Sequence, residues 1–224
     1  MLGWLLSVLG AAMLIPVAVD LADGNSDWTG FLAAAVITGF VGVSLVLTTR
    51  GVPLVLRRQQ AFLLTTLAWV ASAFFSALPF MLSDYRLDLA DAVFETVSGL
   101  TTTGSTVMTG LDTAPPGLLL WRSLLQWLGG MGIIGMSMVI FPFLRIGGMQ
   151  LFKTESSDTS SEKILPSVGR LGIAIGLVYL GLSALCMLAY WTAGMSGFDA
   201  ILVGDALGPA LGGVAFFNDL AREL

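Results

Sequence analysis

The chain has 224 residues, of which 56% are hydrophobic and only 11% are charged, and its mean hydropathy is +0.89. Soluble domains carry about 25% charged residues, so this composition is typical of an integral membrane protein and excludes a water-soluble domain. The net charge of -5 offers no basic surface to a nucleic acid, the single cysteine, Cys186, excludes an intrachain disulfide, and the absence of histidine removes the usual residue of acid–base catalysis and metal sites.

Three apolar segments open the chain, and each is long enough to span a hydrocarbon core of about 30 Å. They predict helices at Leu2–Val19, Phe31–Thr49 and Ala61–Leu82. The first could instead be a signal peptide, but no basic residue follows Met1 and residues 20–27 contain no convincing cleavage site, so a retained anchor helix is expected. Residues 20–27 themselves are expected to form a short acidic loop.

Basic residues indicate the topology, because lysine and arginine in short loops mark the cytoplasmic side. One group follows the second span, and another follows a fourth apolar segment, Leu118–Leu144, with a fifth span expected from Leu171 to about Ala193. These residues are Arg50, Arg57 and Arg58, then Arg145, Lys153, Lys163 and Arg170. We therefore expect a multi-pass protein of the cell's inner (plasma) membrane with a cytoplasmic N-terminus.

The segment between the third and fourth spans is too short to cross a membrane. Asp91–Gly99 has the composition of a helix of only about ten residues, with Asp91 suited to the helix start and Gly99 to its end. Because an outward and an inward span bound it, this segment must enter and leave from the outer face. It predicts a re-entrant helix whose carbonyl end, which favours a cation, points into the membrane.

Ser98–Val107 follows, rich in hydroxyl side chains, which a lipid-facing helix would not choose. A run of threonines closing on Gly104 is one way to point successive backbone carbonyls at a dehydrated cation, with glycine supplying backbone freedom. On these residues alone, the segment is either an ion-selectivity filter or a turn of small polar residues at the membrane surface.

Arg122 lies inside the fourth span, one helical turn from Gln126. It could snorkel to the interface, helped by Trp121 and Trp127 at headgroup depth, or pair with Glu95 of the short helix and brace the loop. For Glu95 bracing is the expected role, because a buried carboxylate beside an ion path would bind ions too tightly to release them.

Gly130–Gly135 matches the glycine spacing of a dinucleotide-binding fingerprint, but it is embedded in an apolar span with no preceding strand. A small-residue face that lets helix backbones approach closely is the favoured interpretation, and a helix bend is the weaker alternative. Its members are Gly129, Gly130, Gly132 and Gly135. No enzyme is expected, because no nucleophile and base converge.

Three sequence stretches, and the order of the segments around them, resemble the Trk-type members of the Trk/Ktr/HKT potassium-transporter superfamily. The stretches are DAVFETVSGLTTTGSTV (residues 91–107), LWRSLLQWLGGMGII (residues 120–134) and GGMQLF (residues 147–152). The close likeness covers roughly residues 89–152, and the segment order continues to Phe198.

The resemblance implies a fold of helix–loop–helix repeats around one central pore, with potassium as substrate and no covalent cofactor. It implies that Thr102 and Thr103 supply carbonyls to potassium, that Gly104 is the filter glycine and that Ser105 lines the outer filter. It also implies a homodimer, or an assembly with the missing repeats, in membrane lipid, with a cytoplasmic nucleotide-binding regulatory subunit.

The chain is therefore interpreted as an all-α integral membrane protein with five spanning helices, one complete helix–pore loop–helix repeat and the start of a second. The expected parts are two leading helices (residues 1–58), a first pore repeat (59–148), a cytoplasmic loop (149–170) and a truncated or altered second repeat (171–224). Gly197–Ile201 resembles the start of another re-entrant helix, but residues 202–224 contain no serine or threonine for a second filter. Two hypotheses stay open: the N-terminal part of a potassium uptake protein, or a non-conducting membrane scaffold or truncated relic.

Overall fold

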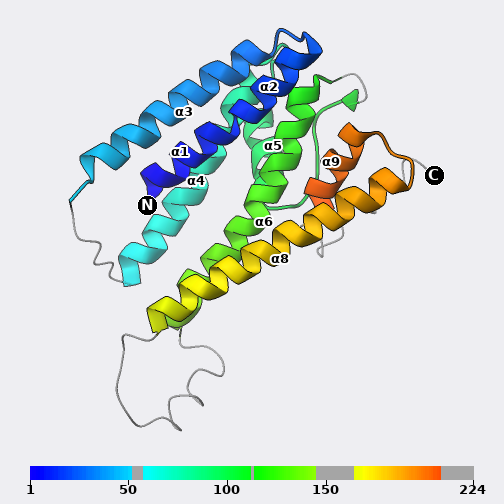
Figure 1. Ribbon diagram of the computed structural model, residues 1–224. Coiled ribbons are helices and arrows are strands. Elements are labelled where there is room, and N and C mark those ends of the chain that lie inside the picture. The colour runs from blue at the N-terminus through cyan, green and yellow to red at the C-terminus, as the bar shows by residue number, and fades with distance from the viewer. Residues whose placement is uncertain (52–57, 112–113, 145–163, 208–224) are drawn as a thin grey trace, which may run out of the picture.

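The computed structural model describes residues 1–51, 58–111, 114–144 and 164–207, and it confirms the all-α prediction for them, because they contain helices and no strand. Figure 1 shows how the helices are arranged. The helices are α1 (Leu2–Ala12), α2 (Leu14–Asp23), α3 (Trp28–Thr48), α4 (Arg58–Leu82), α5 (Leu89–Leu100), α6 (Pro116–Leu144), α8 (Ile164–Thr192) and α9 (Gly197–Leu207).

Three helical stretches in the described part of the chain are long and apolar enough to cross a membrane by length and composition. They are Leu2–Asp23, Trp28–Thr48 and Gln59–Leu82, which correspond to the first three predicted spans. The predicted fourth and fifth spans correspond to α6 and α8, each with 29 residues. That these two also cross the membrane, to give five spans, stays a prediction.

The first span is broken into two helices, contrary to the single anchor helix expected from the apolar run. α1 ends at Ala12 and α2 begins at Leu14, because Pro16 has no N–H to donate to Ala12 and its ring crowds that carbonyl group. The intervening Met13 keeps helical backbone angles (φ -63°, ψ -18°), so the two helices follow one another nearly in line (Figure 1).

The predicted acidic loop at residues 20–27 is also shorter than expected, because α2 continues to Asp23. Gly24 ends this helix in the left-handed conformation, with φ 74°, which glycine adopts without steric penalty. Asp20 consequently lies on a helix rather than in a loop, and its side chain is completely buried.

Helices α1 and α3 pack with their backbones in close contact through glycines. A methyl group added to Gly3 would lie 2.8 Å from the carbonyl oxygen of Gly42, and one added to Gly10 would lie 2.9 Å from the amide nitrogen of Gly39. Small residues of this kind allow helices to associate in a membrane, where burial of apolar surface supplies little driving force. The two leading helical stretches therefore form a tight antiparallel pair.

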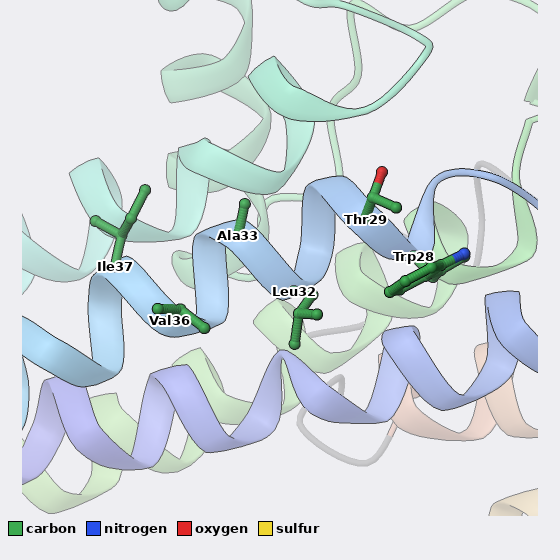
Figure 2. Close-up of a pocket in the computed structure, with 6 residues that line it drawn as sticks. All are labelled: Trp28, Thr29, Leu32, Ala33, Val36 and Ile37. Carbon is green, nitrogen blue, oxygen red and sulfur yellow. The ribbon is translucent and has the colours of Figure 1, made fainter.

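One face of α3 carries apolar side chains, most of which are exposed. Figure 2 shows six of its residues around a shallow, open depression: Trp28, Thr29, Leu32, Ala33, Val36 and Ile37. Farther along the helix Phe40 is 73% exposed. An exposed apolar stripe of this length suits a helix that faces lipid. This agrees with α3 being one of the three stretches that are long and apolar enough to cross a membrane.

The core is built from residues of α1 to α6, and within it the short helix α5 contacts both α4 and α6. Trp121 of α6 is fully buried at its centre, where its ring meets Phe31 edge to face and its indole nitrogen donates to the carbonyl oxygen of Ser76 at 3.1 Å. Trp121 therefore has packing and hydrogen-bond partners inside the protein, and the headgroup depth that the snorkelling interpretation of Arg122 gave it stays a prediction. Trp127 likewise donates inward, to Ser183 of α8.

Helices α8 and α9 pack against α6 and against each other. α8 begins at Ile164 rather than at the predicted Leu171, and most of the predicted cytoplasmic loop lies outside the described residues. α9 begins at Gly197, where the start of another short helix was predicted, and the carbonyl oxygen of Leu202 accepts a hydrogen bond from Ser123 of α6.

Hydrogen bonds join the turn between α2 and α3 to the linker that precedes α5. Asp27, which is 2% exposed, accepts the amide hydrogen of Asp84 at 2.6 Å, and Ser26 donates to the Asp84 carboxylate at 2.7 Å. Burial raises the pKa of Asp27 above its ordinary value of 3.8, and the hydrogen bond from Asp84 opposes part of this rise.

We predict that Asp27→Asn raises the melting temperature of the detergent-solubilised protein at neutral pH. Because the folded state has the higher pKa, it binds a proton more tightly than the unfolded state, so wild-type stability falls as pH rises from about 3.8 through the raised pKa. Asparagine keeps the acceptor for Asp84 but carries no charge. Thermal unfolding at a series of pH values should show a difference that shrinks on acidification.

The control is Asp23→Asn, at the exposed last residue of α2. This substitution should change the melting temperature at neutral pH only slightly, because it alters an exposed side chain. If Asp27→Asn instead follows the wild-type curve across the whole pH range, the buried charge is not destabilising.

Candidate functional site

Helix α5 is a short helix with one buried face, and two acidic residues define its start. Asp88 caps it by accepting the amide hydrogen of Asp91 at 2.8 Å, and Asp91 occupies the first turn, as predicted. With 12 residues, it rises about 18 Å, which is too little to cross a hydrocarbon core of about 30 Å. Its carbonyl end lies inside the protein, at the buried Leu100.

The chain reverses immediately after α5, in residues 101–110, which we call the threonine segment. The amides of Thr101, Thr102 and Thr103 donate back to the carbonyl oxygens of the last helical turn at 2.9 Å each. Thr102 (φ 56°) and Gly104 (φ 75°) both take up left-handed backbone angles. A threonine in that region is strained, because its β-branched side chain crowds the backbone, and such strain persists where surrounding contacts hold it.

Several backbone carbonyl groups of the threonine segment have no hydrogen-bond donor among the described residues. The carbonyl oxygens of Thr102, Thr103 and Gly104 accept no hydrogen bond from any residue in the described ranges. The carbonyl oxygen of Ser105 differs, because it accepts a hydrogen bond from the Ser98 hydroxyl at 2.6 Å. Unbonded carbonyl oxygens at the negative end of a helix are suited to hold a cation that has lost its water.

Glu95 of α5 holds the outgoing half of the threonine segment. Its side chain is 2% exposed, and Oε1 accepts the amide hydrogen of Val107 at 2.6 Å, that of Met108 at 3.2 Å and the hydroxyl hydrogen of Thr106. Its other oxygen, Oε2, lies 2.9 Å from Nε of Arg122 on α6. One carboxylate therefore joins α5, the segment and α6.

Pairing with Glu95 was one of the two sequence interpretations of Arg122, and the structure contains that pair. The hydrogen bonds that Glu95 accepts from the segment were not anticipated. A second contact was missed altogether: the Tyr85 hydroxyl donates to the carbonyl oxygen of Thr109 at 2.6 Å and accepts the amide hydrogen of the same residue at 2.8 Å. The only sequence signal was a tyrosine in a polar linker, which has many other uses. Tyr85 and Glu95 together fix the chain from Thr106 to Thr109.

The end of α5 sits directly on a glycine of α6. A methyl group added to Gly129 would lie 2.0 Å from the carbonyl oxygen of Leu100, so only glycine fits here. Gly132, by contrast, would meet no atom within 4 Å. The expected small-residue packing is thus confirmed at Gly129 and not at Gly132, and the fingerprint-like glycines lie within a helix.

An apolar cavity of about 320 Å³ lies between α1, α4 and α6, beside Leu100. Its polar lining residues include Thr65, whose hydroxyl already donates to the carbonyl oxygen of Ala61. Apolar side chains supply most of the remaining wall. This cavity offers no set of ligands for an ion, so the threonine segment is the stronger candidate.

The chain matches the protein family described as "TrkH: Cation transport protein" over residues 29–216. It belongs to the TrkH family. Members of this family are membrane transporters and not enzymes. The match extends beyond Ile201, so the family likeness continues past the point where no second threonine-rich segment was found.

Relatives of this TrkH-family chain include Trk system potassium uptake protein TrkI of Halomonas elongata, which is 43% identical over 200 residues, 89% of this chain and 40% of the relative. Trk system potassium uptake protein TrkH of the same organism is 38% identical over 233 residues, 100% of this chain and 48% of the relative. The crystal structure of the potassium transporter TrkH from Vibrio parahaemolyticus matches with a TM-score of 0.76 and 34% identity, over 91% of this chain and 40% of that one. The chain thus spans less than half the length of these relatives.

We predict that Gly129→Ala destabilises the protein by about 1–3 kcal/mol or more, because the added methyl group collides with backbone that has no room to move. Gly132→Ala is the matched control on the same helix and should be neutral or slightly stabilising. Thermal unfolding of the two variants in detergent measures the difference. Equal melting temperatures would mean that α5 does not rest on Gly129.

Proposed function

We propose that this chain is part of a potassium uptake protein, and that its threonine segment is one strand of the selectivity filter. The observation that carries the proposal is the set of carbonyl oxygens of Thr102, Thr103 and Gly104, which accept no hydrogen bond from the described residues and follow the buried carbonyl end of a short helix. Such oxygens replace the hydration shell of an alkali ion. Membership of a cation transport family and the potassium uptake proteins among its relatives support the same substrate.

In the proposed filter, potassium is held by Thr102 and Thr103, with Gly104 as the filter glycine and Ser105 at the outer mouth. Because the carbonyl oxygen of Ser105 is already bonded to Ser98, we assign that residue a lining role rather than a coordinating one. Glu95 lies outside the ion path in this proposal, since its oxygens are occupied by the segment and by Arg122.

One segment surrounds an ion from one side only, so the proposal requires further filter segments from the rest of a longer protein or from other chains. We assign residues 1–58 to the leading pair, 59–148 to the first pore repeat, 149–170 to a cytoplasmic connection that includes the start of α8, and 171–224 to a second repeat. An inner-membrane location with a cytoplasmic N-terminus, a dimeric assembly and a nucleotide-binding regulatory subunit complete the proposal.

The test is rubidium uptake into liposomes that contain the tagged chain isolated with its native assembly. Gly104→Val should abolish uptake, because a β-branched residue at φ 75° distorts the carbonyl positions. Gly24→Val is the matched control, since it imposes the same strain at φ 74° in a turn with open space around it. Uptake and selectivity that survive Gly104→Val unchanged would refute the filter assignment.

We further predict that Arg122→Gln lowers both the melting temperature and rubidium uptake, because it leaves the buried Glu95 carboxylate without its charge partner. Breaking a buried ion pair costs about 3–5 kcal/mol. Adding Glu95→Gln should recover part of the lost stability, since the stranded charge is then gone. Intact stability and transport in Arg122→Gln would show that the pair does not brace the segment.

A further inference from the structure

Asp20, on the leading helix α2, makes a contact that spans 97 residues of sequence. Its Oδ1 accepts the amide hydrogen of Gly117 at 2.7 Å. α6 begins at Pro116, which has no N–H, so Gly117 carries the first amide hydrogen of that helix and Asp20 takes it up. A carboxylate at this position also complements the positive end of the helix dipole.

The contact between Asp20 and Gly117 leaves no room for a side chain at residue 117. Asp20 is completely buried, and its second oxygen, Oδ2, has no hydrogen-bond partner among the described residues. A methyl group added to Gly117 would lie 2.3 Å from Oδ2. Asp20 therefore fixes where the first turn of α6 lies, and no side chain at residue 117 separates the two.

The position of α6 is in turn what places Arg122 against Glu95. Gly117 and Arg122 are on one rigid helix, about 7.5 Å apart along its axis. Between them Leu118 and Trp121 are fully buried, so this part of α6 has no freedom to rotate independently. The connection runs from Asp20 through α6 and Arg122 to Glu95, and from Glu95 to the amides of the threonine segment.

A second set of hydrogen bonds connects the leading helices to the threonine segment. Asp27 fixes the amide of Asp84, and the next residue, Tyr85, holds both backbone groups of Thr109. The leading helices thus reach the segment from two directions, through α6 and through the linker before α5.

We propose that the leading helix pair sets the geometry of the selectivity filter and that Asp20 is its principal positioning residue. Asp20 does not touch the permeating ion and acts through α6, Arg122 and Glu95. The inference rests on the proposed function for its transport readout, but its structural readout does not.

The experiment compares Asp20→Ala with Asp20→Asn in the native assembly, by hydrogen exchange and by potassium and sodium flux in liposomes. In Asp20→Ala, the protection of the amides of Val107, Met108 and Thr109 should fall about tenfold, while that of α1 and α3 is unchanged. The potassium-to-sodium flux ratio should fall about threefold or more. Asp20→Asn keeps the acceptor and should retain most of both.

Gly117→Ala tests the same contact from the other side and should reproduce the Asp20→Ala pattern. Asp23→Ala, at an exposed position on α2, is the control and should change neither readout. Unchanged exchange at residues 107–109 in Asp20→Ala would overturn the proposal. A uniform loss of protection across α1–α6, or failure to fold in Asp20→Ala with normal exchange and flux ratio in Gly117→Ala, would also overturn it, because Asp20 would then be merely structural.

Asp20→Ala could lose protection at residues 107–109 while even the wild-type assembly carries no alkali ion flux. This result would distinguish the positioning role of Asp20 from the proposed transport function. The positioning role of Asp20 would then stand, and the proposed transport function would fail.

Discussion

The buried carboxylate of Glu95 is the interaction on which the candidate site depends. Without the hydrogen bonds that it accepts from Thr106, Val107 and Met108, the chain that leaves the threonine segment would lose three contacts with α5. Without Arg122, the carboxylate would be an unpaired charge in an apolar core. Because each group needs the others, α5, the segment and α6 form one cooperative unit.

Much of this unit was predictable from sequence, since its signals are local. The apolar spans, the short helix with acidic residues at its start, and a charge on α6 in need of a partner each follow from composition and spacing. The same reasoning placed Asp20 in a loop, because acidic residues beside Gly24 are typical of a turn, whereas it lies on α2 and contacts Gly117. Contacts such as this one and that of Tyr85 with Thr109 join distant residues and leave no pattern in the sequence.

The packing role of each glycine in α6 also could not be predicted from the sequence. Gly129 and Gly132 are equivalent by spacing on a helix, yet one lies against the backbone of Leu100 and the other meets nothing. Which of them is obligatory depends on where α5 ends relative to α6, and that is decided by the packing of Trp121, Leu118 and Leu125 in the core. The leading helices, which pack by glycine contacts of their own, contribute Leu6, Leu9 and Phe31 to the same core.

The central claim is that bare main-chain oxygens of the threonine segment bind potassium. Anomalous X-ray scattering from crystals of the native assembly grown in rubidium tests it most directly, because rubidium marks potassium positions. The account predicts a peak coordinated by the carbonyl oxygens of Thr102 and Thr103 and none at Glu95. A peak coordinated by the Glu95 carboxylate, or no peak along the segment, would contradict it.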